Sequence, residues 1–403
     1  MKKSIFIFAF GGFGIVTTEF SVIGILPVLA REFQISIDTA GWLLSAFALT
    51  IAVTGPFMVF LTLKINRKWL MSGALFVFVL SNILSVIAPN FTVLMIARII
   101  PALVHPVFWS VAIAAASRQV TPKDVPKAVA VVMGGISVGT VLGVPLTTYI
   151  ADLVNWRGAF IAAGAINLLG LAALLAFIPS MPVPKENTQR SSQIKALANP
   201  QLWVNLVATT IMVAGMFSTY GYLAEYLSKV SHINGKQISL LLLVFGATGV
   251  LGNWVSGIAL SKNVMLTNRL FLIALITVHS LAYSFGGLFL PVAAIVTAWG
   301  FVHTGGFMIS QTLISAEAPE TPELATSLMV SFGNAGFALG AFLGGIVINS
   351  FGVHNVIWMS ILLLLVALGL SFVFLRKRAT VNAVVSVQER KEAEVGEGWA
   401  VAV

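Results

Sequence analysis

Among the ionisable side chains inside long apolar stretches of the sequence, four are candidates for handling a proton or binding a solute: Glu19, Arg98, His105 and His303. A charged carboxylate is costly in apolar surroundings, so burial favours the protonated form of Glu19 and makes it a candidate proton carrier. Arg98 stays charged when buried and therefore needs a partner or water. A histidine can bond a solute hydroxyl or pass a proton on. Proton coupling is the chemistry that these residue types suggest.

Spacing places three of the candidates on one helix face. His105 follows Arg98 by seven residues, nearly two turns, and Trp109 follows His105 by one turn. We expect Arg98 to act on Glu19, the acid that lies within an apolar stretch in this part of the chain. The alternative is that Arg98 bonds carbonyl groups at a helix end, and that each histidine makes an ordinary interhelical hydrogen bond.

Aromatic and amide groups elsewhere suggest a lined cavity. Tyr220 lies in the seventh apolar stretch and Gln311 in the tenth, and His303 falls one residue from the repeat equivalent of His105. Such groups suit sugars or amphipathic drugs, whereas Glu225 is expected to anchor a membrane interface. The predicted solute cavity is lined by His105, Trp109, Tyr220, His303 and Gln311.

The apolar stretches are long enough to cross a bilayer. The 403 residues are 58% hydrophobic and 9% charged, far below the roughly 25% charge of soluble domains. The stretches lack the alternation of membrane barrels, so an all-α membrane protein with twelve transmembrane helices is predicted. The predicted spans are 5–30, 41–63, 69–88, 92–116, 127–150, 158–178, 203–228, 237–261, 269–288, 291–316, 325–350 and 354–375.

The chain divides into two six-helix halves, residues 1–179 and 201–378, joined by a polar linker at 180–200 and followed by a tail at 379–403. A shift of 197 residues pairs Gly139 with Gly336 and Gly143 with Gly340, at equivalent places in the two halves. Parallel six-helix repeats around a site at the midplane are a secondary-transporter architecture.

Glycines recur every fourth residue in the fifth span, at Gly135, Gly139 and Gly143, and Pro145 follows. Gly336 and Gly340 repeat the pattern in the eleventh span. Glycine at this spacing makes a flat face that allows a neighbouring helix to approach closely. This face either serves ordinary helix packing or forms the surface on which the two halves rock.

Charge distribution predicts orientation. Of the 23 basic residues, eighteen fall in the segments on one side of the predicted spans, four on the other side, and Arg98 within a span. This asymmetry places both termini in the cytoplasm. The absence of cysteine excludes thiol chemistry and disulfides. The sequence has no phosphate-binding loop, metal-ligand motif or paired carboxylates, so we predict neither enzyme activity, cofactor, metal nor nucleic-acid binding.

Several segments resemble the major facilitator superfamily: RIIPALVHPVFWS from Arg98, GTVLGVPL from Gly139, and WR at Trp156. TTEF at Thr17, GNWVSG at Gly252 and NAGFALGAFLGG at Asn334 resemble its bacterial drug and sugar efflux (drug:proton antiporter-1) branch, and the sugar and arabinose efflux permeases in particular. In that branch, the element from Gly139 to Pro145 is similar to the antiporter motif associated with export. LKINRKW departs from the family pattern, with Leu63 where an acid is usual and Asn66 where glycine is usual.

The sequence therefore predicts a monomeric, proton-coupled secondary transporter in the bacterial inner membrane. It would export a sugar or sugar-like compound by alternating access, with Glu19 and Arg98 handling the proton. Its partners would be a small solute, protons and the lipid bilayer. A multidrug/proton antiporter is the main alternative, and a non-transporting membrane receptor on the same scaffold is a further one.

Overall fold

The computed structural model describes residues 2–62, 65–121, 125–181, 195–319 and 321–373. Within them are twelve helical spans long and apolar enough to cross a membrane, and no strand is formed in these ranges. The predicted twelve-helix, all-α fold is confirmed. Most of the predicted linker and the whole of the predicted tail lie outside the described residues.

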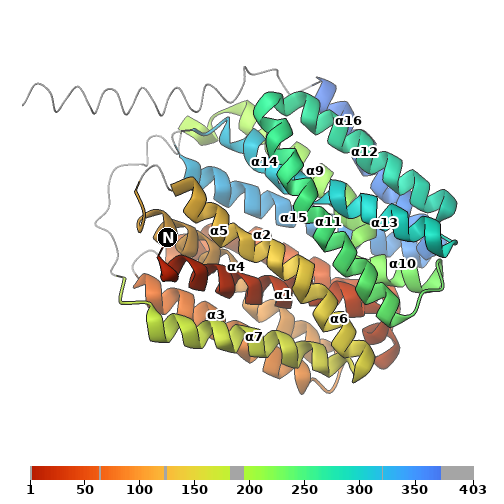
Figure 1. Ribbon diagram of the computed structural model, residues 1–403, viewed down its shortest axis with the longest axis horizontal. Coiled ribbons are helices and arrows are strands. Elements are labelled where there is room, and N and C mark those ends of the chain that lie inside the picture. The colour runs from red at the N-terminus through yellow and green to blue at the C-terminus, as the bar shows by residue number, and fades with distance from the viewer. Residues whose placement is uncertain (1, 63–64, 122–124, 182–194, 320, 374–403) are drawn as a thin grey trace, which may run out of the picture.

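The first six spans occupy the lower part of Figure 1, coloured red to yellow-green. The fifth of them changes from α-helix to a turn of π-helix and back. Their elements are α1 Lys3–Glu32, α2 Ile37–Leu61, α3 Arg67–Val86, α4 Phe91–Ser117, α5 Val125–Val138, η2 Gly139–Gly143, α6 Val144–Leu153 and α7 Trp156–Phe177.

The last six spans lie above them in green and blue (Figure 1). Two spans predicted as continuous are interrupted, the seventh after Tyr220 and the tenth after His303. Their elements are α9 Pro200–Tyr220, α10 Leu223–Lys229, α11 Gly235–Lys262, α12 Val264–Phe285, α13 Phe289–His303, α14 Gly305–Ser315, α15 Pro322–Phe351, η3 Val353–Asn355 and α16 Val356–Val373.

Asparagine side chains set where six of these helices begin. In each case the amide oxygen accepts a hydrogen bond from a backbone N–H in the first turn, which would otherwise lack a partner. Asn66 caps α3 in this way, and its amide nitrogen also donates to Ser180 at 2.8 Å. Asn66, which stands where the family pattern has glycine, is therefore a helix cap. The capping residues are Asn66, Asn90, Asn155, Asn199, Asn234 and Asn263.

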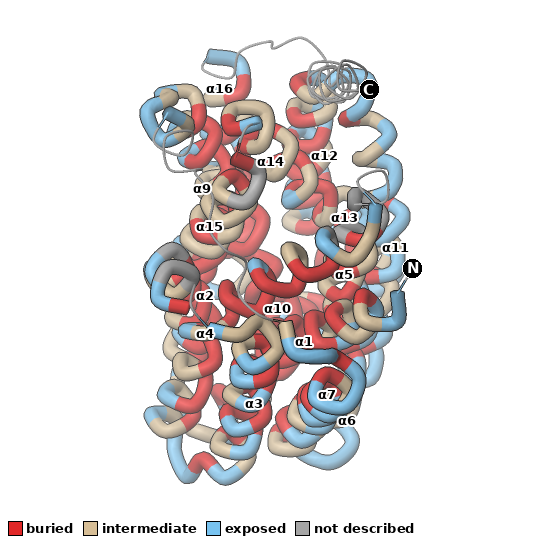
Figure 2. The backbone as a smooth tube through the Cα atoms, turned by 90° about the vertical axis from the view of Figure 1, so that its left-hand side faces the viewer, coloured by how far each residue is buried: buried red, intermediate tan, exposed pale blue. Residues whose placement is uncertain are grey.

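Helix α1 is enclosed by its neighbours. In its most apolar stretch 83% of the residues are buried, whereas the corresponding share for α7 is 33%. Figure 2 shows the buried residues on the inner faces of the helices and the exposed ones around the outside. The outer faces carry large apolar side chains such as Phe57, Phe177 and Trp254, as expected for contact with lipid tails. Glu19 is thus carried by a helix at the centre of the protein.

The glycine faces make this enclosure possible. A Cβ on Gly135 would collide with the carbonyl oxygen of Ala9, and a Cβ on Gly139 would lie 2.6 Å from Val16 Cγ1, so α5 and η2 press directly against α1. Gly336 repeats the contact in the second half, where a Cβ would lie 2.5 Å from the carbonyl oxygen of Thr210 on α9. Each face therefore packs inside its own half, and the expectation that it forms the surface between the halves is wrong.

The π-turn η2 coincides with the end of the glycine repeat. Pro145 stands at the second position of α6 and has no backbone N–H, so the α-helical hydrogen-bond pattern cannot run through it. A π-turn absorbs the interruption without ending the span. The carbonyl oxygen of Pro145 accepts a hydrogen bond from the Ser239 hydroxyl of α11 at 2.8 Å, which links the two halves.

Further contacts between the halves gather at the end of the molecule where α1 finishes and α2 begins, called here the α1–α2 end. A Cβ on Gly345 of α15 would lie 3.3 Å from Cβ of Asp38 on α2. A Cβ on Gly41 would collide with the Tyr222 hydroxyl, which donates to Ala341 at 2.8 Å. At this end, the backbone of α15 at Gly345 therefore lies against the Asp38 side chain of α2.

Adjacent glycines provide a direct test of the α5 packing. Gly135→Ala should lower the free energy of unfolding by about 1–3 kcal/mol, because its methyl group would overlap α1. Gly134→Ala is the matched control, since nothing lies within 4 Å of a Cβ there, and it should gain about 0.5–1 kcal/mol from better helix formation. Unfolding of both variants in detergent micelles measures the difference; equal stability would show that α5 does not press on α1 at this site.

Candidate functional site

Glu19 pairs with a histidine. Its carboxylate oxygen Oε2 lies 3.1 Å from Nε2 of His105 on α4, and Glu19 is only 6% exposed. Helix α1 packs against α4, and this packing brings the two residues into contact although 86 positions separate them in the sequence. An acid and a histidine in contact inside a membrane protein can share and release a proton.

Arg98 does not bind the Glu19 carboxylate. Its Nη1 donates to the carbonyl oxygen of Thr18 at 2.6 Å and its Nη2 to that of Glu19 at 2.9 Å, and its guanidinium lies 5.0 Å from the centre of the Phe47 ring. The expected side-chain pair is therefore replaced by contacts to the α1 backbone. Because the guanidinium bonds to the backbone of Glu19 itself, its positive charge is close enough to compensate the negative charge of the carboxylate.

Trp109 completes the cluster on α4. Its Nε1–H donates to His105 Nε2 at 3.2 Å, on the same nitrogen that faces Glu19. Gly12 of α1 leaves space for the indole, because a Cβ there would lie 2.5 Å from the ring. The spacing argument that grouped Arg98, His105 and Trp109 on one face is consistent with this geometry, and the structure adds Glu19 opposite them.

Two buried asparagines support the turn that carries Glu19. Asn82 on α3 and Asn167 on α7 both donate to the hydroxyl of Thr18, at 3.0 and 2.8 Å. Asn167 also donates to the carbonyl oxygen of Gly14 at 3.0 Å. Sequence reasoning missed both residues, although an amide inside an apolar stretch is a signal of this kind.

His303 has a different environment. Both of its ring nitrogens are buried without a hydrogen-bond partner, and its ring centre lies 4.8 Å from that of Tyr220 and 5.4 Å from those of Phe217 and Phe245. No acid accompanies it in the described contacts. The two histidines predicted as equivalent are thus chemically distinct, one paired with an acid and the other set among aromatic rings.

Aromatic rings connect the two sites across the halves. Phe20 follows Glu19 on α1, and its ring centre lies 6.1 Å from that of Phe217 on α9 and 5.8 Å from that of Phe337 on α15. Gln311 is not part of this group among the described contacts; it donates to Ser315 at 2.7 Å and to Thr326 at 3.3 Å and so joins α14 to α15. Among the described contacts, the residues predicted to line a cavity form two pairs, His105 with Trp109 and Tyr220 with His303, and Gln311 belongs to neither.

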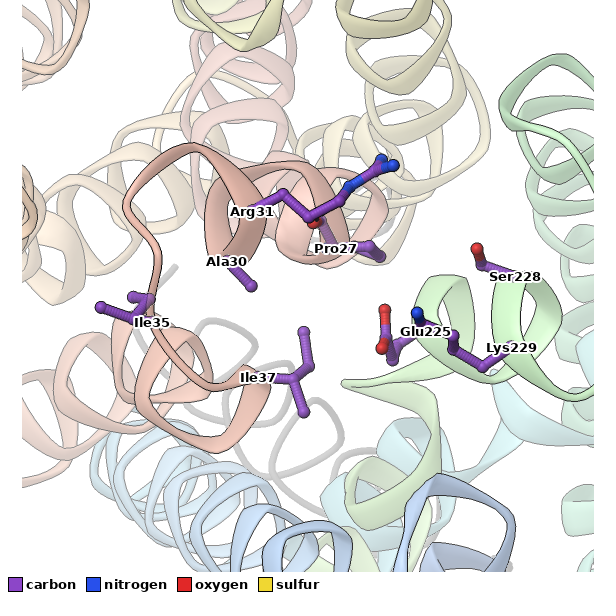
Figure 3. Close-up of a pocket in the computed structure, with 8 residues that line it drawn as sticks. All are labelled: Pro27, Ala30, Arg31, Ile35, Ile37, Glu225, Ser228 and Lys229. Carbon is purple, nitrogen blue, oxygen red and sulfur yellow. Dashed lines mark hydrogen bonds between the residues drawn. The ribbon is translucent and has the colours of Figure 1, made fainter.

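A pocket of about 330 Å³ lies between the halves at the α1–α2 end (Figure 3). Glu225 of α10 points into it and is 9% exposed, and Arg31 of α1 stands on the opposite wall. Glu225 was expected at a lipid interface, and its place in a pocket between the halves could not be read from the sequence. The lining residues are Pro27, Ala30, Arg31, Ile35, Ile37, Glu225, Ser228 and Lys229.

Comparison with known proteins decides the family. The model of the Major Facilitator Superfamily matches residues 8–323. The chain belongs to the major facilitator superfamily. This facilitator is therefore a multi-pass membrane transporter and not an enzyme, as the sequence resemblance predicted.

Individual relatives agree with this assignment. The facilitator is 31% identical to the uncharacterized MFS-type transporter YfhI of Bacillus subtilis, over 88% of this chain and 89% of that one. It is 30% identical to the inner membrane transport protein YdhP of Escherichia coli K12, over 85% and 88%. It is 28% identical to a probable sugar efflux transporter of Helicobacter pylori P12, over 87% and 90%.

A solved structure shares the fold. The crystal structure of a bacterial homologue of the human lysosomal transporter Spinster, in an inward-facing and occupied conformation, superposes with a TM-score of 0.74. The match covers 92% of this chain and 96% of the other at 16% identity. The arrangement of two six-helix halves is thus that of facilitator transporters.

The contacts of Arg98 predict a stability effect. Arg98→Ala should lower the free energy of unfolding by about 2–3 kcal/mol, because it removes two buried, charge-assisted hydrogen bonds to α1. Arg157→Ala is the control: this half-exposed side chain pairs with Glu32 at 3.5 Å and donates to the carbonyl oxygen of Val86 at 3.2 Å. Water competes for both contacts, so the loss should be smaller, about 1 kcal/mol. Denaturation in mixed micelles compares them, and similar losses would mean that the contacts with α1 add little.

Proposed function

We propose that this facilitator is a proton-coupled exporter of a small solute, and that the Glu19–His105 pair carries the proton. The supporting observation is the buried carboxylate 3.1 Å from a histidine nitrogen at the centre of the protein. A carboxylate so placed has no bulk water to stabilise its charge, so loss and gain of a proton change its interactions strongly. That sensitivity is what a coupling site requires.

Alternating access would connect the proton to the solute. With both termini in the cytoplasm, as the distribution of basic residues favours, the α1–α2 end faces outward and the opposite end faces the cytoplasm. A proton entering from outside would neutralise Glu19, and a solute from the cytoplasm would bind once the proton has left. Inward movement of one charge supplies about 2.3 kcal/mol per 100 mV of membrane potential.

A sugar or sugar-like compound is the proposed solute. The Helicobacter relatives named as probable sugar efflux transporters support it, as does a site that combines aromatic faces with the polar groups of His105 and Trp109. The aromatic cluster of Phe20, Phe217 and Phe337 favours the second candidate, export of amphipathic drugs, because such rings suit planar apolar compounds. In both cases we propose a monomer in the bacterial inner membrane.

Replacement of the proposed proton carrier gives the first test. Wild-type protein in proteoliposomes is screened with labelled sugars and dyes for transport driven by a pH gradient. Glu19→Gln should abolish this transport yet retain counterflow exchange, because the amide keeps the shape of the site but binds no proton. Glu32→Gln, which alters a half-exposed carboxylate, should retain both activities. Gradient-driven transport by Glu19→Gln at the wild-type rate would contradict the proposal.

A cross-link between the halves tests alternating access. The chain has no cysteine of its own, and Cβ atoms at positions 38 and 345 would lie 3.3 Å apart, near the disulfide spacing of about 3.8 Å. The double variant Asp38→Cys, Gly345→Cys should form a disulfide on oxidation, hold the α1–α2 end closed and stop transport. Reduction should restore transport to the rate of the unoxidised double variant.

The two single-cysteine variants control for the cost of each substitution. Neither should respond to oxidant, because neither can close a bridge within the chain. Full transport by the cross-linked protein would show that the α1–α2 end need not open.

A further inference from the structure

Two groups converge on one ring nitrogen in the centre of the protein. His105 Nε2 lies 3.1 Å from Glu19 Oε2 and 3.2 Å from Trp109 Nε1, whereas its other nitrogen, Nδ1, is buried without a partner. We propose that Trp109 is a positioning residue of the proton site, whose indole N–H competes with Glu19 for His105 Nε2. Proton binding at Glu19 would thereby control whether this N–H is available to a solute. The inference rests on the proposed proton coupling.

The competition arises because an imidazole nitrogen can donate or accept a hydrogen bond but cannot do both. An imidazole nitrogen either carries a hydrogen, and then donates one bond, or carries a lone pair, and then accepts. An indole N–H can only donate, and an ionised carboxylate can only accept. The contact from Trp109 therefore requires a bare Nε2, whereas an ionised Glu19 requires Nε2–H. One nitrogen cannot satisfy both at once.

The proton-loaded state is compatible with both contacts at Nε2. With Glu19 protonated and the histidine neutral, the hydrogen of the ring lies on Nδ1 and Nε2 carries a lone pair. The Glu19 O–H and the Trp109 N–H share that single lone pair as a three-centre hydrogen bond, which holds the indole. The ionised state lacks the indole bond, so this bond contributes to the stability of the loaded state.

Release of the proton reverses the arrangement. The Glu19 hydrogen passes from Oε2 to Nε2, and the Nδ1 hydrogen, which has no partner among the described residues, passes to water that enters when the transport cycle opens the protein. The pair loses one proton in total. Nε2–H then donates to the ionised carboxylate, and the indole N–H loses its acceptor. It becomes free to donate to a hydroxyl, ether or carbonyl oxygen of a solute. Solute and proton would thus exclude each other through Trp109.

Few other charges face the pair. Arg98 lies on the same face of α4 and binds the backbone of the Glu19 turn. The other described charged side chains of the helices packed on α1 and α4 lie toward helix ends, at Lys3, Arg31 and Glu32 on α1, Asp38 on α2, Arg67 and Lys68 on α3, Asp152 on α6, Arg157 on α7, Glu225 and Lys229 on α10, and Lys236 and Lys262 on α11. The proton balance of the cluster is therefore set by Glu19, His105 and Arg98.

Trp109→Phe keeps the ring that packs at Gly12 and removes only the donor. Because the loaded state loses a hydrogen bond, the pH midpoint of Glu19 should move to lower pH by about half to one unit. The probe is the proton itself: the infrared carbonyl band of the protonated carboxyl group, identified by its absence in Glu19→Gln, is followed across pH in purified protein.

Trp299 provides a matched control. It is a buried tryptophan beside a histidine, 4.5 Å from the His279 ring centre, but its Nε1 has no hydrogen-bond partner. Trp299→Phe should leave the Glu19 midpoint unchanged. An unshifted midpoint in Trp109→Phe, or an equal shift in both variants, would overturn the inference.

A measurement on wild-type protein avoids dependence on the variants. With nitrogen-15 in the indole rings of the nine tryptophans, one N–H resonance should move with the same pH midpoint as the Glu19 band and should stay still in Glu19→Gln. Absence of any such resonance would overturn the role of Trp109 alone. The proposed function fails separately, if Glu19→Gln keeps gradient-driven transport.

Discussion

The cost of placing charge inside a membrane shapes the centre of this protein. Among the described residues, no carboxylate bonds to Arg98. Its guanidinium donates to two carbonyl oxygens of α1, and the Glu19 carboxylate pairs with His105. Both contacts require α1 and α4 to lie at a particular depth and rotation. The remaining helices hold α1 and α4 at this depth and rotation. Asn82 and Asn167 contribute by donating hydrogen bonds to Thr18, in the turn of α1 that carries Glu19.

Close helix approach supplies that support. Lipid tails are as apolar as leucine, so helices in a membrane associate through packing and internal hydrogen bonds more than through the hydrophobic effect. Gly135 and Gly139 bring α5 and η2 onto α1, and Gly336 brings α15 onto α9 by the same contact. The repeat thus preserves the packing within each half, while the contacts between halves depend on other residues such as Asp38, Gly345 and Ser239.

The chemistry is divided unequally between two similar halves. The first half holds an acid, an arginine and a histidine at its centre, and the second holds a histidine among aromatic rings with neither nitrogen bonded. Phe20, next to the acid, reaches the rings of the second half. A change in the protonation of Glu19 therefore occurs next to Phe20, the residue that contacts the aromatic rings of the other half.

The sequence by itself determined the twelve spans and the grouping of Arg98, His105 and Trp109, because apolar length and helical period are properties of neighbouring residues. Only the tertiary structure decided that Glu19 meets His105 while Arg98 meets the α1 backbone, and that the glycine faces pack inside each half. It also assigned Glu225 to a pocket and separated Gln311 from the other cavity residues. These outcomes depend on the rotation and depth of helices distant in sequence, which no local pattern encodes.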